Sequence, residues 1–189
     1  MKPRILGRFL MAGALLASAG FVGAADRSSA SVPSTNGDIA KEVRHEIVMY
    51  PYYTLWDDIS FRVADNGTVE LMGAVSQPYK KVDIERLVRR LPGVSAVKDD
   101  ITVLPVSFED DRLRLRVARA IYSEPTLQRY ALQAVPPIHI IVENGHVRLE
   151  GVVNNQFEKN LAGLRAAGAG LSFGPVVNNL EVESPAKRS

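Results

Sequence analysis

The sequence contains no cysteine, and this absence excludes several kinds of chemistry at once. Without thiols the chain has no disulfide framework, no thiolate nucleophile and no thiolate metal site. A lipoprotein anchor is excluded too, because it requires a cysteine at the cleavage site. Aromatic residues are also scarce, at 7% of the chain, and Trp56 is the single tryptophan. Its fluorescence therefore reports on one place in the molecule.

Long apolar runs are missing from most of the chain, and the N-terminal one is short. Three basic residues precede an uncharged run at 9–22, which is shorter than the roughly 20 residues of a membrane-spanning helix. This layout is typical of a secretory signal peptide. We expect residues 1–25 to be cleaved after Ala25, giving a soluble periplasmic protein that is not a lipoprotein. An uncleaved N-terminal anchor is the alternative.

An excess of positive charge is absent once this segment is set aside. Three of the 23 basic residues and none of the 21 acidic residues precede Asp26, which leaves 20 basic against 21 acidic side chains. The basic isoelectric point therefore gives no support for nucleic acid as a partner. Any attraction to phosphate must come from a local cluster of basic residues.

A short sequence occurs twice, as NGTVELMGAV at 66–75 and NGHVRLEGVV at 144–153. Apolar residues at helical spacing precede each copy, predicting helices that start at Asp38 and at Asp110 or Asp111. A second helical pattern and a final strand, 97–103 or 176–182, follow each copy. The predicted fold class is α+β: two tandem α-β-β-α-β modules, each a three-stranded mixed sheet covered on one face by two helices.

The predicted organisation has five parts. These are a signal peptide at 1–25, a flexible leader at 26–37, modules at 38–104 and 110–183, and a tail at 184–189. Only a short joint separates the modules, and domains of this size bury little more than about 60% of their unfolded surface, so they are marginally stable alone. We therefore expect the two modules to pack against each other.

The turns of the two copies predict the strand register. A two-residue Asn144-Gly145 turn pairs Val142 with Val147. The first copy has one residue more, which predicts a longer loop or a bulge with Gly67 at positive φ. Gly73 and Gly151 occupy inward positions, and we expect a helix backbone to approach each closely.

The repeated motifs, followed by LPGVSAVKDDITV and FGPVVNNLEV, resemble two BON domains, a bacterial module found in osmotically induced periplasmic proteins. The resemblance covers about 145 of 189 residues. It implies a role in envelope maintenance under osmotic stress and contact with phospholipid surfaces.

Catalytic and metal-binding patterns are hard to find. His139 and His146 are predicted on the outer face of the second hairpin, opposite Glu150 and Glu143, without a third strong ligand. The adjacent aspartates, such as Asp57-Asp58, are expected to point into solvent. No nucleophile with a base and an orienting acid can be assembled. We predict no catalytic residue, no metal, no cofactor and no enzymatic activity.

One helix carries a basic stripe that could bind a partner. Arg112, Arg116 and Arg119 lie at i, i+4 and i+7, with Tyr122 at the end. Such a stripe could bind anionic lipid headgroups, weakly and peripherally. The alternative is a solvated helix face whose charge is balanced by neighbouring acidic residues. A weaker basic candidate includes Lys80, Lys81 and Arg86.

The aromatic segment YPYYTLW at 50–56 is the second candidate. Its residues Tyr52, Tyr53 and Trp56 suit a membrane interface, but they could equally seal one module against the other. The leading hypothesis is a non-enzymatic periplasmic protein that contacts anionic phospholipid, with envelope proteins as further partners. The alternative is a protein-binding or chaperone-like adaptor that uses a sheet edge or the aromatic segment.

Overall fold

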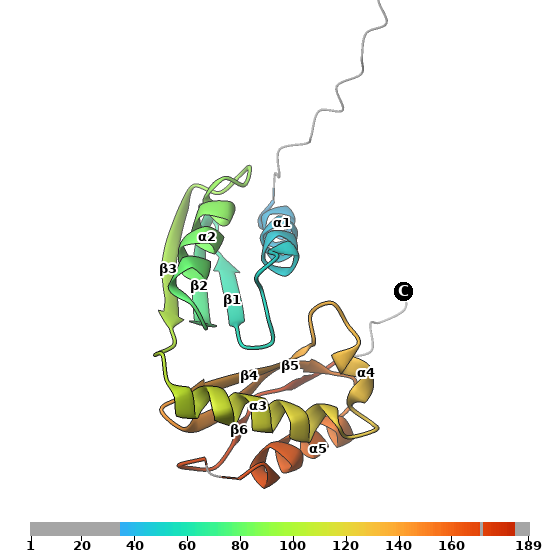
Figure 1. Ribbon diagram of the computed structural model, residues 1–189. Helices are drawn as coiled ribbons and strands as arrows, with labels where there is room; N and C mark the ends of the chain where they lie inside the picture. Colours follow the sequence, from blue (N-terminus) through green and yellow to red (C-terminus); the bar gives the residue numbers. More distant parts are fainter. Residues whose placement is uncertain (1–34, 171, 184–189) are drawn as a thin grey trace, which may run out of the picture. The chain divides into compact units, whose positions relative to one another are not determined.

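The computed structural model describes residues 35–170 and 172–183 (Figure 1). The predicted signal peptide, most of the predicted leader and the predicted tail lie outside these residues. The first module consists of α1 (Asn36–Met49), β1 (Asp58–Val63), β2 (Thr68–Val75), α2 (Pro78–Arg89) and β3 (Ala96–Val103). Its element order is the predicted one.

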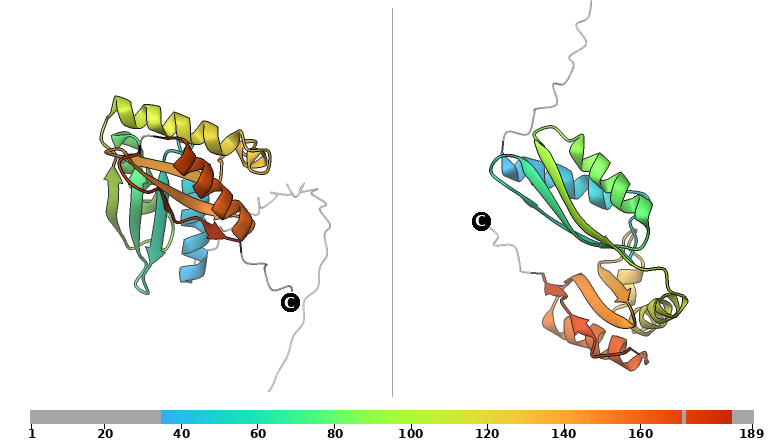
Figure 2. Two further views of the ribbon diagram at one scale, coloured as in Figure 1. Left: turned by 90° about the horizontal axis from the view of Figure 1, so that it is seen from below. Right: turned by 90° about the vertical axis from the view of Figure 1, so that its left-hand side faces the viewer.

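The second module repeats this order with two additions. It consists of α3 (Phe108–Tyr122), α4 (Gln128–Ala131), β4 (Ile138–Glu143), β5 (His146–Val153), α5 (Gln156–Gly168), β6 (Val177–Asn178) and β7 (Glu181–Val182). Figure 2 shows α3 and α5 side by side, and the two helices contact each other as well as the sheet. No helix within the described ranges is long and apolar enough to cross a bilayer.

Each module has a mixed sheet with the repeated NG motif leading into its central strand. In the first, β2 pairs antiparallel with β1 and parallel with β3. In the second, β5 pairs antiparallel with β4 and parallel with β6 and β7. The predicted single last strand is interrupted, because the Asn178 side chain binds the amide of Leu180 and the carbonyl of Lys159.

The predicted registers are confirmed. Val142 lies opposite Val147, and Val63 lies opposite Val69. The longer first loop spans Ala64 to Gly67, with Gly67 at a φ of 77°. The longer loop thus keeps the apolar residues of both strands on one face.

The two cores are built from equivalent positions. Val69 and Leu71 in the first module, and Val147 and Leu149 in the second, are fully buried. Helix residues at matching positions cover them, namely Ile39, Val43 and Ile47 in α1 and Leu113, Val117 and Ile121 in α3. The helices of each module therefore pack on one face of its sheet, as the apolar spacing predicts.

The predicted starts of the first helices are wrong by a few residues. Thr35 caps α1 and Ser107 caps α3, because their hydroxyl oxygens accept the amides of Asp38 and Asp110. The aspartates stand in the first turn instead. Asp110 is buried there, where its carboxylate accepts the amides of Asn144 and Gly145 at 2.9 and 2.8 Å.

The expected helix contact at Gly73 and Gly151 is also wrong. Both glycines have positive φ, 113° and 111°. A side chain at Gly73 would overlap the carbonyl of Asp58, and one at Gly151 would overlap that of Pro137. The neighbouring strand, and not a helix, requires glycine at these two positions.

A buried ion pair ties the residue before β1 to α2. Contrary to the expectation, Asp57 is therefore not in solvent, and Lys80 of the weaker basic candidate is buried instead of available to a partner. The ammonium group of Lys80 lies 2.6 Å from the Asp57 carboxylate. Asp57 also accepts hydrogen bonds from Thr54 and from Ser76. Burial opposes its charge, but the hydrogen bonds from Lys80, Ser76 and Thr54 outweigh burial and lower the pKa of Asp57.

The second module makes the same connection with opposite charges. Glu158 occupies the position in α5 that Lys80 occupies in α2, 78 residues earlier. Its buried carboxylate binds Arg129 and the Tyr130 hydroxyl, which precede β4. Both modules thus join their second helix to the segment before the first strand by a polar clamp.

The first clamp yields a stability prediction. Lys80→Met leaves the Asp57 carboxylate buried without its counter-charge and should lower the free energy of unfolding by about 3 kcal/mol. Arg86→Met removes an exposed ion pair with Asp83 and should cost under about 1 kcal/mol. Urea unfolding at pH 7 measures both.

The pH dependence checks the assignment of this effect. Because the pKa of Asp57 is lowered on folding, its contribution is present above the unfolded pKa of about 4 and disappears as pH falls through the lower folded value. The cost of Lys80→Met should therefore shrink on acidification. Equal losses for the Lys80 and Arg86 variants would contradict a buried clamp.

Candidate functional site

The exposed face of α3 carries apolar and basic side chains in one stripe. Phe108, Arg112, Leu115 and Arg119 follow one another at spacings of four, three and four residues, so they share one side of the helix. Phe108 and Leu115 are 74% and 50% exposed. We call these four residues the α3 stripe. Arg116 flanks it and is half-buried.

The acidic residues near the α3 stripe are largely engaged elsewhere. Asp110 binds the β4–β5 turn, Asp111 pairs with Arg114, and Glu124 pairs with Arg165. Among the acidic residues that the structure describes, only Glu109 pairs with the stripe, at 3.7 Å from Arg112. Within the described ranges, Arg116 and Arg119 form no ion pair. Neighbouring carboxylates therefore neutralise only part of the charge on this face.

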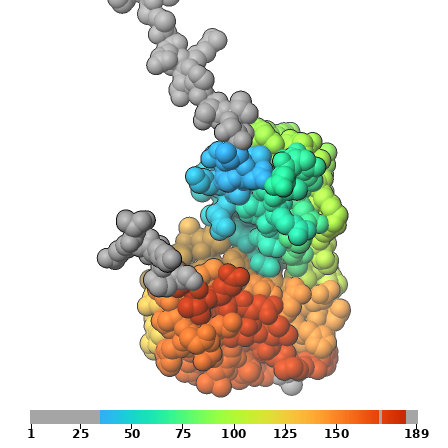
Figure 3. Space-filling view, turned by 180° about the vertical axis from the view of Figure 1, so that it is seen from behind, coloured from blue at the N-terminus to red at the C-terminus, as the bar shows by residue number. Residues whose placement is uncertain are grey.

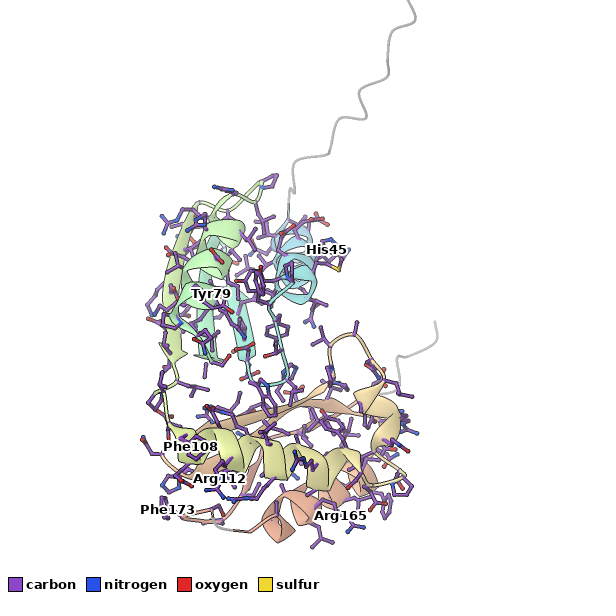
Figure 4. The ribbon with its side chains drawn as sticks, in the orientation of Figure 1. His45, Tyr79, Phe108, Arg112, Arg165 and Phe173 are labelled. Carbon is purple, nitrogen blue, oxygen red and sulfur yellow. The ribbon has the colours of Figure 1, made fainter. Side chains whose placement is uncertain are left out.

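The start of α3 lies at one end of the second module together with a second exposed phenylalanine. Figure 4 shows Phe108, Arg112 and Phe173 gathered at this end. The guanidinium of Arg112 lies 5.6 Å from the centre of the Phe108 ring, in the range of a cation–π contact. Phe173 is 83% exposed, and its amide donates to the carbonyl of Gly145. The β4–β5 turn thus holds the second ring.

Tyr122, predicted beside the basic stripe, has a structural contact. Its hydroxyl donates to the carbonyl of Ile138 at 2.7 Å. Burial raises the pKa of Tyr122. The side chain is half-buried, and it fixes the end of α3 against β4.

The three aromatic residues proposed from the 50–56 segment lie in different surroundings. Tyr53 packs against the first core, and Trp56 packs with Leu55 against the second core. Tyr52 is exposed, with its ring edge-on to Tyr50 and Tyr79. The contacts of Tyr53 and Trp56 support the interpretation that this segment packs between the modules.

Other contacts also join the modules. The amide of Ile140 donates to the carbonyl of Leu55 at 2.8 Å. Ala74 and Leu104 form a small buried cluster with Ile141. The expected packing of the two modules is confirmed by these contacts.

His139 is buried, so its predicted place on the outer face is wrong. It does lie opposite Glu150, but Tyr53 covers it, with ring centres 5.4 Å apart. Sequence alone could not show this cover. His146 lies opposite Glu143 and is exposed, as predicted. In residues 35–170 and 172–183, no group of three His, Asp or Glu side chains is placed to hold a metal.

The first residue of β1, Asp58, has a carboxyl group whose pKa is shifted. Burial raises the pKa of Asp58 to about 6, and the negative charge of Glu150 adds to this while Arg148 opposes it. The aspartate next in sequence to the buried Asp57 therefore titrates within the range of mildly acidic conditions.

The repeat and its geometry agree with a known family. Models of the BON domain match the chain twice, at residues 35–105 and 109–184. The chain belongs to the BON domain family. BON domains are associated with membranes and envelope components in general, and this tandem protein carries two of them.

The other comparisons do not extend this assignment. No curated protein matches its sequence. Two solved structures of CdsD, a structural protein of the type III secretion system of Chlamydia trachomatis, are similar at 16% and 18% identity with TM-scores of 0.31 and 0.30. They cover 77% of this chain, which spans 65% and 61% of theirs. The family matches alone therefore carry the assignment.

Sequence reasoning missed the apolar members of the candidate site. Phe108 and Leu115 lie on the same helical side as Arg112 and Arg119, and this spacing could have identified them. Phe173 had no such signal, because its position depends on a turn that is distant in sequence.

The raised pKa of Asp58 generates a prediction. Stability linked to protonated Asp58 is present below the unfolded pKa of about 4 and is lost as pH rises through about 6. Asp58→Asn should therefore be more stable than the native protein at pH 7 and should lose this advantage near pH 4. Chemical denaturation across this pH range measures the difference, and a gain that does not vary with pH would contradict the assignment.

Proposed function

We propose that the protein binds anionic phospholipid surfaces of the bacterial envelope peripherally, through the α3 stripe. The observation that carries the proposal is an exposed helix face on which two arginines alternate with two apolar side chains, while three of the four nearby carboxylates are bound elsewhere. The association of BON domains with envelope components supports it.

The chemistry of the stripe suits a lipid interface. Guanidinium groups form two parallel hydrogen bonds to phosphate, and Phe108 and Leu115 can enter the region below the headgroups. Each arginine near an anionic surface contributes about 1 kcal/mol. Arg112, Arg116 and Arg119 together therefore support weak binding that depends on salt.

The proposed site of action is the periplasm. A signal-like N-terminal segment supports export of the protein. The proposed role is envelope maintenance without catalysis. Clustered basic charge on one helix, in a chain whose remainder is nearly neutral, favours a local surface contact over general attraction to polyanions.

Vesicle sedimentation tests the basic part of the stripe. Arg112→Gln, Arg116→Gln and Arg119→Gln combined should weaken binding to vesicles rich in phosphatidylglycerol by roughly two orders of magnitude, given about 1 kcal/mol for each charge. Zwitterionic vesicles, or high salt, should abolish binding of the native protein.

A matched control variant removes the same number of positive charges from a different helix. Arg86→Gln, Arg89→Gln and Arg90→Gln remove three arginines from the end of α2 in the first module. This variant should bind like the native protein. An equal loss in both variants would indicate general charge attraction and would exclude a site on α3.

The apolar members need a separate measurement. Phe108→Ser with Leu115→Ser should lower binding to anionic vesicles about tenfold, because two exposed apolar side chains no longer enter the lipid. The salt dependence should stay, since the arginines remain. Unchanged affinity would limit the contact to headgroups.

A further inference from the structure

The first strand of each module presents backbone groups away from its partner. Just after β1 the amide of Ala64 donates to the carbonyl of Thr68 at the start of β2. Every second residue before Ala64 therefore points its backbone amide and carbonyl toward β2. Ile59, Phe61 and Val63 therefore turn their amides and carbonyls outward. Just before β4 the carbonyl of Pro137 accepts the amide of Val152 of β5. The odd-numbered residues of β4 therefore face β5, and Ile138, Ile140 and Val142 turn their backbone groups outward.

In β4 each of these three residues has an outward group with a partner. Tyr122 donates to the carbonyl of Ile138, and the Leu55 carbonyl accepts the amide of Ile140. The guanidinium of Arg114 donates to the carbonyl of Val142 at 2.6 Å. The edge of the second sheet is thus covered by two side chains of α3 and one extended segment.

The first module lacks the same covering groups. The buried residues of α1 and α3 correspond at a distance of 74 positions, as Val43 and Val117 show. Ala40 therefore replaces Arg114, and Val48 replaces Tyr122. Neither side chain can donate a hydrogen bond.

The free edge of β1 faces a groove. The amide of Ile59 reaches the hydroxyl of Tyr53, whereas within the described ranges Phe61 and Val63 have no outward partner. The groove has a volume of about 780 Å³ and is lined by Ala40, Ile47, Val48, Ile59, Phe61 and Val63. It lies between α1 and β1, which are neighbours on the face shown in Figure 3.

The charge of the groove indicates which kind of ligand would fit it. Arg44 lines it, while no carboxylate does. Within the described residues Arg44 forms no ion pair. An extended segment with apolar side chains and a carboxylate is therefore complementary in shape and charge.

We propose that the β1 edge binds an extended, acidic and apolar peptide segment of another protein as an added strand. Such binding uses backbone hydrogen bonds for affinity and side-chain pockets for selection. The molecule contains its own example, because the segment at Leu55 and Trp56 lies on the β4 edge with both side chains against the second core. The groove is continuous with this contact, since Tyr53 and His139 line its end.

The sequence that precedes α1 is a poorer occupant of the groove. Residues 26–34 read DRSSASVPS, where the only bulky apolar residue, Val32, precedes a proline. Proline has no amide to donate to a strand edge. A partner segment rich in Leu, Trp and Asp fits the groove better.

The test uses a peptide with the sequence of residues 52–58, YYTLWDD, labelled with fluorescein. Fluorescence anisotropy with the purified protein should show saturable binding. A peptide of the same sequence with N-methylated alternate amides should bind at least tenfold more weakly, because its backbone cannot pair. Amide NMR shifts should move at Phe61 and Val63, and shifts confined to Ile140 would overturn the proposal.

A variant that copies the second module should close the edge. Ala40→Arg with Val48→Tyr supplies the two donors found in α3 and should weaken peptide binding at least tenfold. His45→Arg with Met49→Tyr adds the same side chains at exposed positions of α1 outside the groove and should leave binding unchanged. Native-like affinity in a folded Ala40→Arg, Val48→Tyr protein would overturn the proposal.

A second variant tests the proposal even if the Ala40→Arg, Val48→Tyr protein does not fold. Arg44→Glu should weaken binding of the acidic peptide by at least tenfold, and no change would count against the proposal.

Two outcomes would assign the groove to another occupant. If the protein forms a dimer without peptide, and Ala40→Arg with Val48→Tyr abolishes that dimer, the edge binds a second copy of the chain. Displacement of the peptide from Phe61 by phospholipid vesicles would assign the groove to acyl chains. Both outcomes would overturn the peptide assignment.

Discussion

The backbone hydrogen bond from Ile140 to Leu55 constrains much of the structure. It holds the segment before β1 against the edge of β4, so that Leu55 and Trp56 enter the second core. The next residue, Asp57, then lies beside Ser76 and Lys80, where its charge needs several donors. One strand edge in the second module thus determines where the first module buries its ion pair.

The two modules share a backbone plan and differ in what they leave open. In the second module, α3 uses Arg114 and Tyr122 to cover the β4 edge, and its outer side presents the α3 stripe. In the first module, the small side chains of α1 leave a groove beside β1. Duplication therefore gave one module with a basic helix face and one with an accessible edge, from nearly the same arrangement of strands.

The sequence predicts the repeated fold well because the fold depends on local patterns. The NG turns, the alternation around Val69 and Val147, and the helical spacing around Val43 and Val117 each determine an element without reference to distant residues. The register of both hairpins follows from the lengths of their turns. Family membership followed from the same motifs.

The buried polar groups could not be predicted in this way. Asp57, Lys80 and His139 are polar side chains in positions that look exposed along their own strand or helix, yet all three are buried in the folded protein. The close contacts at Gly73 and Gly151 likewise depend on the start of the first strand of each hairpin. The arginines of the candidate site were visible as a helical pattern, whereas the occupation of the neighbouring acids is a property of the folded state.

The opposite polarity of the two clamps affects how a tandem protein folds. Repeated domains with similar sequences can exchange equivalent elements during folding. If α5 packed on the first sheet, the carboxylate of Glu158 would meet that of Asp57, and α2 on the second sheet would bring Lys80 toward Arg129. Like charges in a buried site are costly. The inverted clamps therefore favour pairing of each helix with its own sheet and disfavour misassembly between the two halves.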